Sequence, residues 1–118
     1  MILIIGGRGA GKRTYAKEMG YAKGDMADGV LDARPVVYHV QDMVFADPAA
    51  SMGLLPMLCA KEVVICDEVG SGVIPLERAN REAREATGRL CAALAAEATR
   101  VIRMVCGIPQ IIKEAQGK

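Results

Sequence analysis

The residues with the most specific chemistry lie near the start of the sequence. Gly6-Gly7-Arg8-Gly9-Ala10-Gly11-Lys12 matches Gly-x-x-x-x-Gly-Lys, the pattern of loops that bind nucleotide phosphates. Glycines let backbone N–H groups turn toward phosphate oxygens, and the lysine reaches the terminal phosphates. We therefore predict a nucleotide-binding loop made of Gly6, Gly7, Arg8, Gly9, Ala10, Gly11, Lys12, Arg13 and Thr14. The alternative interpretation is a glycine-rich turn without a ligand.

Arg13 departs from this pattern, which normally closes with serine or threonine. That hydroxyl ligates Mg²⁺, whereas a guanidinium has no acceptor atom and cannot bind a cation. Thr14 offers a hydroxyl one residue later, but one helical step turns it by about 100° from the expected metal position. The departure therefore affects the expected catalysis more than the expected phosphate binding.

A second group of candidates, Asp67 and Glu68, follows the apolar run at 63–66. Carboxylates at the end of an apolar strand are the layout of a Walker B element, and ligands bind at that end of parallel strands. We expect Asp67 to hold Mg²⁺ and Glu68 to orient the attacking hydroxyl or accept its proton. The predicted catalytic residues are Lys12, Asp67 and Glu68, with ATP or GTP and Mg²⁺ as cofactors. The alternative is that both carboxylates are merely exposed at a strand end.

Hydrophobic patterning predicts the elements that position these groups. We expect strands at 2–5, 36–40, 62–66 and 100–106, a loop at 24–29, and helices at 12–19, 47–60 with a kink or break at Pro56, and 75–98. Strands and helices that alternate in this way form a mainly parallel sheet. The predicted fold class is therefore α/β, as a three-layer P-loop NTPase (RecA-like) fold, with residues 1–118 as a single nucleotide-binding domain.

Composition limits the classes of partner. The 118 residues carry a formal net charge of +1 and only 3% aromatic residues, which argues against nucleic acid. No apolar stretch reaches the roughly 18 residues of a membrane span. The cysteines, which include no Cys-x-x-Cys pair, are expected to be small core residues in a reduced setting: Cys59, Cys66, Cys91 and Cys106. We therefore expect a cytoplasmic protein.

Three later segments carry a family resemblance, and they are Glu68-Val69-Gly70-Ser71-Gly72-Val73-Ile74-Pro75, Thr87-Gly88-Arg89-Leu90, and 100–109. With the glycine loop, they resemble the adenosylcobinamide kinase/adenosylcobinamide-phosphate guanylyltransferase family. The resemblance implies a P-loop fold, usually a trimer, and a role in cobalamin biosynthesis. It also implies phosphorylation of the adenosylcobinamide hydroxyl with ATP or GTP, followed by GMP transfer through a guanylylated histidine.

The middle of the sequence departs from that family. The family has a histidine shortly before an Arg-Pro pair and a strand that ends in Asp-Cys-x-Thr, whereas residues 29–33 before Arg34 and Pro35 contain no histidine. The only histidine, His39, falls in the predicted strand at 36–40, where a packing or edge role is expected. Asp67 stands where the family often has asparagine, so it is expected to take over as the metal-binding carboxylate.

These departures leave three functions open. The first is a phosphotransferase of the adenosylcobinamide kinase type, and the missing histidine argues against guanylyl transfer. The second is a non-catalytic nucleotide- or phosphate-binding module that has lost the nucleophilic histidine and the metal-binding hydroxyl. The third is a small P-loop kinase for an unrelated substrate. The expected partners are a nucleotide and a corrinoid, and the resemblance adds a homotrimer.

Overall fold

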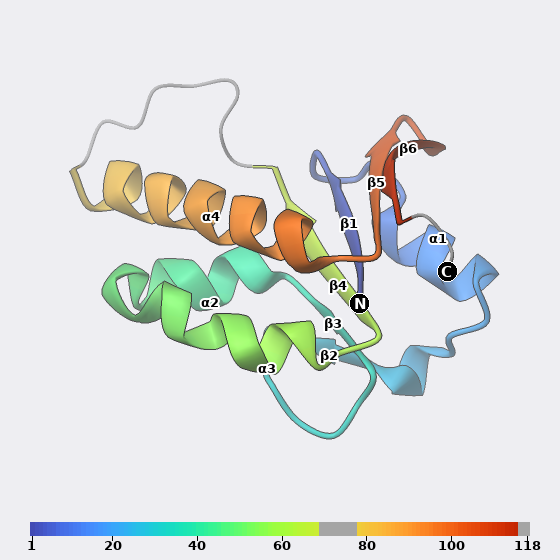
Figure 1. Ribbon diagram of the computed structural model, residues 1–118, viewed down its shortest axis with the longest axis horizontal. Helices are drawn as coiled ribbons and strands as arrows, with labels where there is room; N and C mark the ends of the chain where they lie inside the picture. The colour runs from blue at the N-terminus through green and yellow to red at the C-terminus, as the bar shows by residue number, and fades with distance from the viewer. Residues whose placement is uncertain (69–77, 116–118) are drawn as a thin grey trace.

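One sheet of six strands, in the order β2-β3-β4-β1-β5-β6, organises the residues that the structure describes (Figure 1). The structure is a computed structural model that describes residues 1–68 and 78–115. The strands are β1 (Ile2–Gly6), β2 (Met26–Asp28), β3 (Val36–Tyr38), β4 (Val63–Asp67), β5 (Arg100–Val105) and β6 (Ile108–Glu114). The first five run parallel, and β6 pairs antiparallel with β5.

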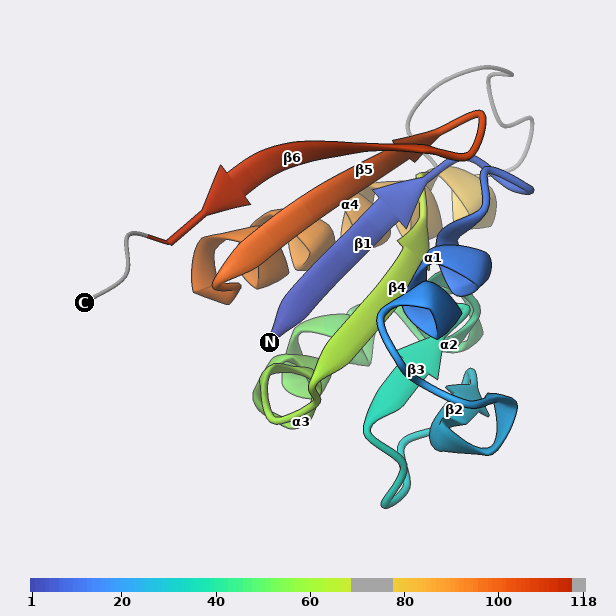
Figure 2. The same ribbon diagram turned by 90° about the vertical axis from the view of Figure 1, so that its right-hand side faces the viewer.

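Helices cover both faces of this sheet, so the predicted three-layer α/β architecture with a mainly parallel sheet is confirmed (Figure 2). The helix α1 (Lys12–Glu18) covers one face. The other face is covered by α2 (Val40–Ala46), the 3₁₀ segment η2 (Pro48–Leu54), α3 (Leu55–Cys59) and α4 (Arg78–Glu97). Because β1 is central and both its faces are covered, it needs a continuous aliphatic run, and Leu3 and Ile4 are buried on opposite faces.

The long helix α4 supplies much of the larger core cluster. Its buried residues recur at spacings of three and four and therefore form one face: Ala83, Ala86, Leu90 and Leu94. Thr87, also buried on this helix, donates its hydroxyl to the carbonyl of Ala83 at 2.8 Å, which satisfies a polar group inside the core. The predicted start of this helix at Pro75 lies outside the described residues.

Three elements differ from the sequence-based expectations. The predicted loop at 24–29 contains the short strand β2, whose only ladder partner among the described residues is β3. The predicted strand at 36–40 ends at Tyr38, and the chain turns there into α2, which was not predicted. The antiparallel edge strand β6 was also missed, because its residues are mostly exposed and carry no clean alternation of apolar and polar residues.

The helix predicted for 47–60 is interrupted as expected. The 3₁₀ segment η2 ends at Leu54 and α3 begins at Leu55, which places Pro56 in the first turn of the new helix. Proline is tolerated there because a first-turn N–H has no partner within the helix.

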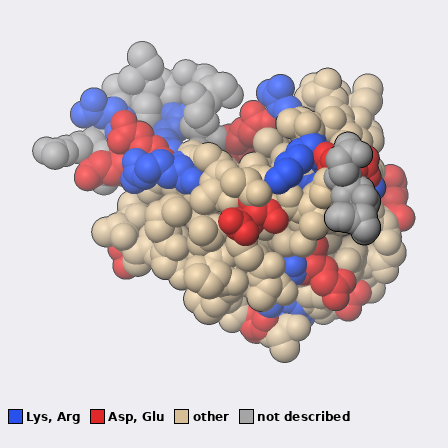
Figure 3. Space-filling view, in the orientation of Figure 1, with Lys and Arg blue, Asp and Glu red and all other residues tan. Residues whose placement is uncertain are grey.

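The surface carries both signs of charge, and the side shown in Figure 3 has a broad uncharged area over α2 and α3. Among the described residues, no helix is long and apolar enough to cross a membrane. The expectation for the cysteines holds for Cys66, which is fully buried, and in part for Cys59 and Cys91. It is wrong for Cys106, which is exposed in the turn between β5 and β6.

Candidate functional site

The glycine loop lies between the end of β1 and the start of α1, as the sequence predicted. At Gly6 the chain passes so close to β5 that an added Cβ would lie 2.6 Å from the carbonyl oxygen of Met104. Gly9 and Gly11 have φ angles of 76° and 96°, a region that other L-residues rarely adopt. The glycines therefore permit the backbone conformation that the loop needs in order to turn at the C-terminal end of β1.

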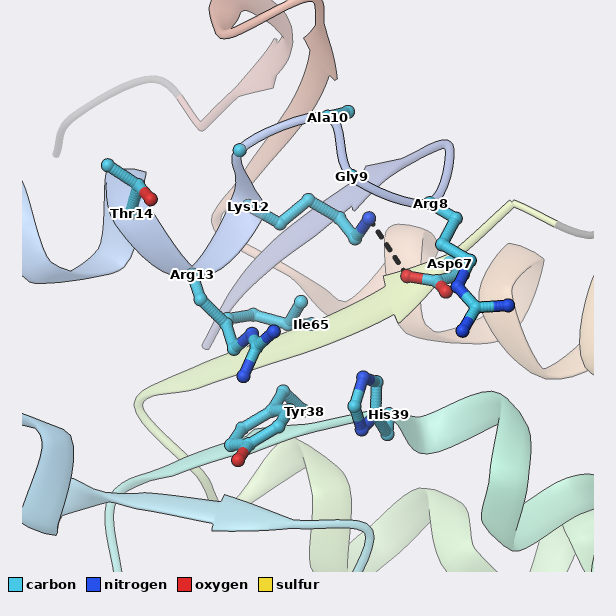
Figure 4. Close-up of a pocket in the computed structure, with 11 residues that line it drawn as sticks. Arg8, Gly9, Ala10, Lys12, Arg13, Thr14, Tyr38, His39, Ile65 and Asp67 are labelled. Atoms are coloured by element: carbon cyan, nitrogen blue, oxygen red, sulfur yellow. Dashed lines mark ion pairs between the residues drawn. The ribbon is translucent and has the colours of Figure 1, made fainter.

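Lys12 reaches back across this loop and is almost fully buried. Its ammonium donates to the carbonyl oxygen of Gly7 at 2.6 Å and pairs with Oδ1 of Asp67 at 2.8 Å (Figure 4). Its side chain is 6% exposed, so both partners are needed to compensate for removing the charge from water. The structure thus brings together Lys12 and Asp67, two of the three predicted catalytic residues.

Asp67 has a further partner that sequence reasoning missed, the side chain of Gln41. The Gln41 amide donates to Oδ2 of Asp67 at 3.2 Å and accepts from the backbone N–H of Asp67 at 3.1 Å. Gln41 is itself buried in the first turn of α2. It was missed because α2 was not predicted, and the sequence pattern assigned residues 41–46 to no element.

Glu68 does not share the environment of Asp67. In β4, Ile65 packs on the α1 side of the sheet and Cys66 on the α4 side, so side chains alternate between the faces. Alternation puts Asp67 on the α1 side and directs the next residue elsewhere. Glu68 accepts from Arg103 of β5, at 2.7 Å from Nε and 3.3 Å from the second guanidinium nitrogen. Its predicted role beside the attacking hydroxyl stays a prediction.

The loop, β3 and β4 together line a pocket of about 450 Å³. The lining residues are Arg8, Gly9, Ala10, Gly11, Lys12, Arg13, Thr14, Tyr38, His39, Ile65 and Asp67. Most of the predicted phosphate-binding residues therefore line one cavity, with Gly6 and Gly7 in the adjoining chain. In Figure 4 Thr14 lies well apart from Asp67, whereas Arg13 lies over the ring of Tyr38, 4.7 Å from its centroid.

His39 is a pocket residue, and the sequence-based assignment of it to a strand is wrong. It occupies the left-handed region at φ 56° and forms the N-cap position of α2, where the chain must leave β3 sharply. Its Nδ1 lies 2.6 Å from Oδ1 of Asp28 at the end of β2. No sequence signal pointed to this contact, because β2 was interpreted as a loop.

The donor set around Asp67 determines how a metal ion could fit. No group of three or more histidine, cysteine, aspartate or glutamate side chains suited to a metal lies within residues 1–68 and 78–115. Both carboxylate oxygens of Asp67 already have partners, Lys12 and Gln41. Mg²⁺ can be held by one carboxylate when phosphates and water supply the remaining oxygens. The residues therefore fit Mg²⁺ only together with a bound nucleotide, whose phosphates would draw Lys12 away.

Behind the site, Cys66 precedes Asp67 in β4 and packs under α4. A hydrogen bond with Cys91, together with burial, raises the pKa of the Cys66 thiol well above its ordinary value. The pKa of Cys91 is lowered, chiefly by the hydrogen bond with Cys66. Cys66 therefore stays a neutral thiol near pH 7 and is poorly suited to act as a nucleophile.

Comparison with known proteins identifies the family. No curated protein matches the chain significantly. Residues 36–112 match the cobinamide kinase / cobinamide phosphate guanyltransferase family. The match runs from β3 into β6 and includes Tyr38, His39, Gln41 and Asp67, whereas the glycine loop precedes it. Because the match spans well over half of the 118 residues, the chain belongs to the cobinamide kinase / cobinamide phosphate guanyltransferase family.

Proposed function

We propose that the protein binds ATP or GTP in the pocket beside the glycine loop and transfers the terminal phosphoryl group to a corrinoid hydroxyl, as in adenosylcobinamide. The observation that carries this proposal is the buried Lys12 ammonium, which the loop and Asp67 hold at the wall of a 450 Å³ pocket. Family membership supports the corrinoid as the acceptor class. The strand, glycine loop and helix in sequence, within a three-layer parallel architecture, also support the P-loop NTPase (RecA-like) assignment.

In this proposal each residue has a distinct role. Loop N–H groups and Lys12 bind the phosphates, so the Lys12 ammonium exchanges part of its contact with Asp67 for phosphate oxygens. The acceptor oxygen forms a bond to the terminal phosphorus while the bond to the bridging oxygen breaks, and the nucleoside diphosphate leaves. Mg²⁺ held by Asp67 and the phosphates would neutralise charge that develops on the leaving group. Glu68 accepts the hydroxyl proton only after its carboxylate separates from Arg103.

The direct test is incubation with adenosylcobinamide and either Mg-ATP or Mg-GTP, followed by mass spectrometry of the corrinoid. We expect the phosphorylated product with at least one nucleotide and none with Lys12→Met, whose side chain has similar bulk and no charge. Absence of product with both nucleotides would contradict the kinase proposal. If the nucleotide then raised the melting temperature without Mg²⁺, the non-catalytic nucleotide-binding module would be the better description.

Asp67→Asn separates two roles that Asp67 can have. If Asp67 holds the metal, the variant loses most of the Mg²⁺-dependent part of nucleotide affinity. If Asp67 only restrains Lys12, the variant frees the ammonium and nucleotide affinity without Mg²⁺ rises. Titrations of nucleotide in EDTA and in Mg²⁺ distinguish the two, and unchanged Mg²⁺-dependent affinity would overturn the metal assignment.

One observation favours a second activity, guanylyl transfer through His39. The carboxylate of Asp28 can hold Nδ1–H of the imidazole, which leaves Nε2 as the nucleophile, and His39 lines the same pocket as the loop. Nε2 would bond to the α-phosphorus of GTP while the α–β phosphoanhydride bond breaks and pyrophosphate leaves. A phosphate oxygen of the acceptor would then take the GMP group from the histidine.

This second activity is tested with GTP labelled at the α-phosphate. We expect an acid-labile, alkali-stable label on the protein that is absent in His39→Ala and reduced in Asp28→Asn. A label that persists in His39→Ala would exclude a histidine intermediate, because His39 is the only histidine in the sequence. The homotrimer implied by the resemblance stays a prediction, which light scattering of the purified protein would check.

A further inference from the structure

A second hollow adjoins the nucleotide pocket and is not assigned by the proposed function. It has a volume of about 250 Å³ and is lined by Arg13, Thr14, Lys17, Lys23, Met26 and Tyr38. Three of these six residues are cations and none is a carboxylate. Arg13, Thr14 and Tyr38 line both cavities, so the two are neighbours that share a wall.

Three positively charged side chains share this hollow. Arg13 and Lys17 are four residues apart on α1 and therefore lie on the same face, where like charges repel. Lys23 comes from the 3₁₀ segment η1 (Lys23–Asp25), which follows the turn after α1. Within residues 1–68 and 78–115, none of the three forms an ion pair. An oxyanion bound between these three cations would offset the repulsion that they exert on one another in the folded protein.

The geometry at Arg13 suits a phosphate group. The guanidinium carbon of Arg13 lies 4.7 Å from the centroid of the Tyr38 ring, which restrains the side chain, and no hydrogen bond to a described residue occupies its N–H edge. That edge is a planar fork of donors that matches the oxygens of a phosphate. Thr14 adds a hydroxyl donor, and the buried Met26 with Tyr38 forms an apolar wall for a short organic group.

We propose that this hollow binds the phosphomonoester group of a second ligand while the nucleotide occupies the loop pocket. The inference deepens the proposed function and rests on it for the identity of the first ligand. The volume lies below the range of typical ligand pockets, which fits a phosphate with a short organic stem and excludes a whole nucleotide. Arg13 stands where the loop pattern normally has the metal-binding hydroxyl. In this proposal its positive charge lies between the two cavities and attracts the phosphate of the second ligand.

The test uses glycerol 3-phosphate as the probe in calorimetric titrations, with the free protein and with protein saturated by a non-hydrolysable GTP analogue. We expect glycerol 3-phosphate to bind the saturated protein as well, with a weaker affinity because Arg13 lines both cavities and the analogue is itself negatively charged. The affinity should fall as salt is raised. Loss of glycerol 3-phosphate binding in the presence of the analogue would overturn the proposal, since the probe would then be occupying the glycine loop.

Variants locate the site independently of nucleotide binding. We expect Lys17→Gln/Lys23→Gln to weaken glycerol 3-phosphate binding at least tenfold, whereas Lys12→Met changes it less than threefold. The matched control is Arg81→Gln/Arg89→Gln, which removes two exposed cations from α4, a helix on the opposite face of the sheet. Equal weakening in the control would show a general charge effect and overturn the site. If the analogue fails to bind, the proposed function fails, while these variants still decide the second site.

Discussion

The two faces of the sheet are covered very differently. On one face, α2, α3 and α4 cover the sheet through buried aliphatic side chains, such as Leu90 and Leu94 of α4. On the other face, the seven-residue α1 covers only part of the sheet, and both cavities lie beside it. The contrast indicates that the α4 face provides most of the stability, whereas the α1 face leaves room for ligands. Substitutions on the two faces should therefore affect different measurements.

The largest expected effect on stability is on the α4 face. Leu90→Ala should lower the free energy of unfolding by about 2–5 kcal/mol, because it removes buried methyl groups and leaves a cavity in the core. Urea denaturation followed by circular dichroism measures the change. Met57→Ala, at a side chain that is 52% exposed, is the control and should change stability by less than about 0.5 kcal/mol. Equal effects would contradict the assignment of stability to this face.

On the α1 face, the largest expected effect is on ligand affinity. Lys12→Met should weaken nucleotide binding at least thirtyfold, or about 2 kcal/mol, because a charged hydrogen-bond donor to phosphate is lost. It should also lower stability by about 1–3 kcal/mol, since Asp67 keeps only Gln41 as a partner. Calorimetric titration and urea denaturation measure the two effects. Nucleotide affinity that survives the change would remove Lys12 from the site.

A smaller effect is expected at the pair between Glu68 and Arg103, which lies away from the loop pocket. Both side chains are partly exposed, so the pair should contribute less than about 1 kcal/mol to stability. A double-mutant cycle with Glu68→Gln and Arg103→Gln measures this coupling. Glu68 acts in the reaction after separating from Arg103 if Glu68→Gln lowers kcat and Arg103→Gln raises it. An unchanged kcat in both variants would exclude a catalytic role for Glu68.

The smallest expected effect concerns pH and lies outside both faces, in the turn before β3. Hydrogen bonds from Arg34, through its side chain and its backbone, lower the pKa of Asp32 to about 2. Because the folded pKa is below the unfolded one, the stabilisation is present above about pH 4 and is lost as pH falls through about 2. NMR titration of the carboxyl carbon should show a midpoint near 2 that rises toward its ordinary value in Arg34→Gln. An unshifted midpoint in the wild type would contradict this pairing.

Several features could be predicted because each depends on residues close together in the chain. The aliphatic run at 2–5 predicted a buried central strand, and the glycines with Lys12 predicted a tight loop before a helix. The apolar face of α4 was visible in the spacing of Leu90 and Leu94. The edge elements β2 and β6 were missed because β2 has only three residues and β6 is mostly exposed, so neither shows the apolar pattern of a buried strand.

The candidate site shows the same division. Proximity of Lys12 and Asp67 follows from the parallel pairing of β1 with β4, which the order of elements favoured but only the sheet register decides. His39 lines the pocket and Gln41 reaches Asp67 because the chain turns sharply after Tyr38, at a left-handed residue that no propensity predicts. The separation of Asp67 from Glu68 is the exception, because alternation along a strand would have predicted it.

Local sequence is sufficient to predict the layered α/β class, the glycine loop and the placement of Asp67 at the end of an apolar strand. These features rest on backbone freedom at glycine and on the period of apolar residues, which are local properties. The tertiary structure is needed to show that Gln41 binds Asp67 and that His39 lies in the pocket. Those contacts join elements distant in the chain, so they are fixed by packing and sheet order and not by the local sequence pattern.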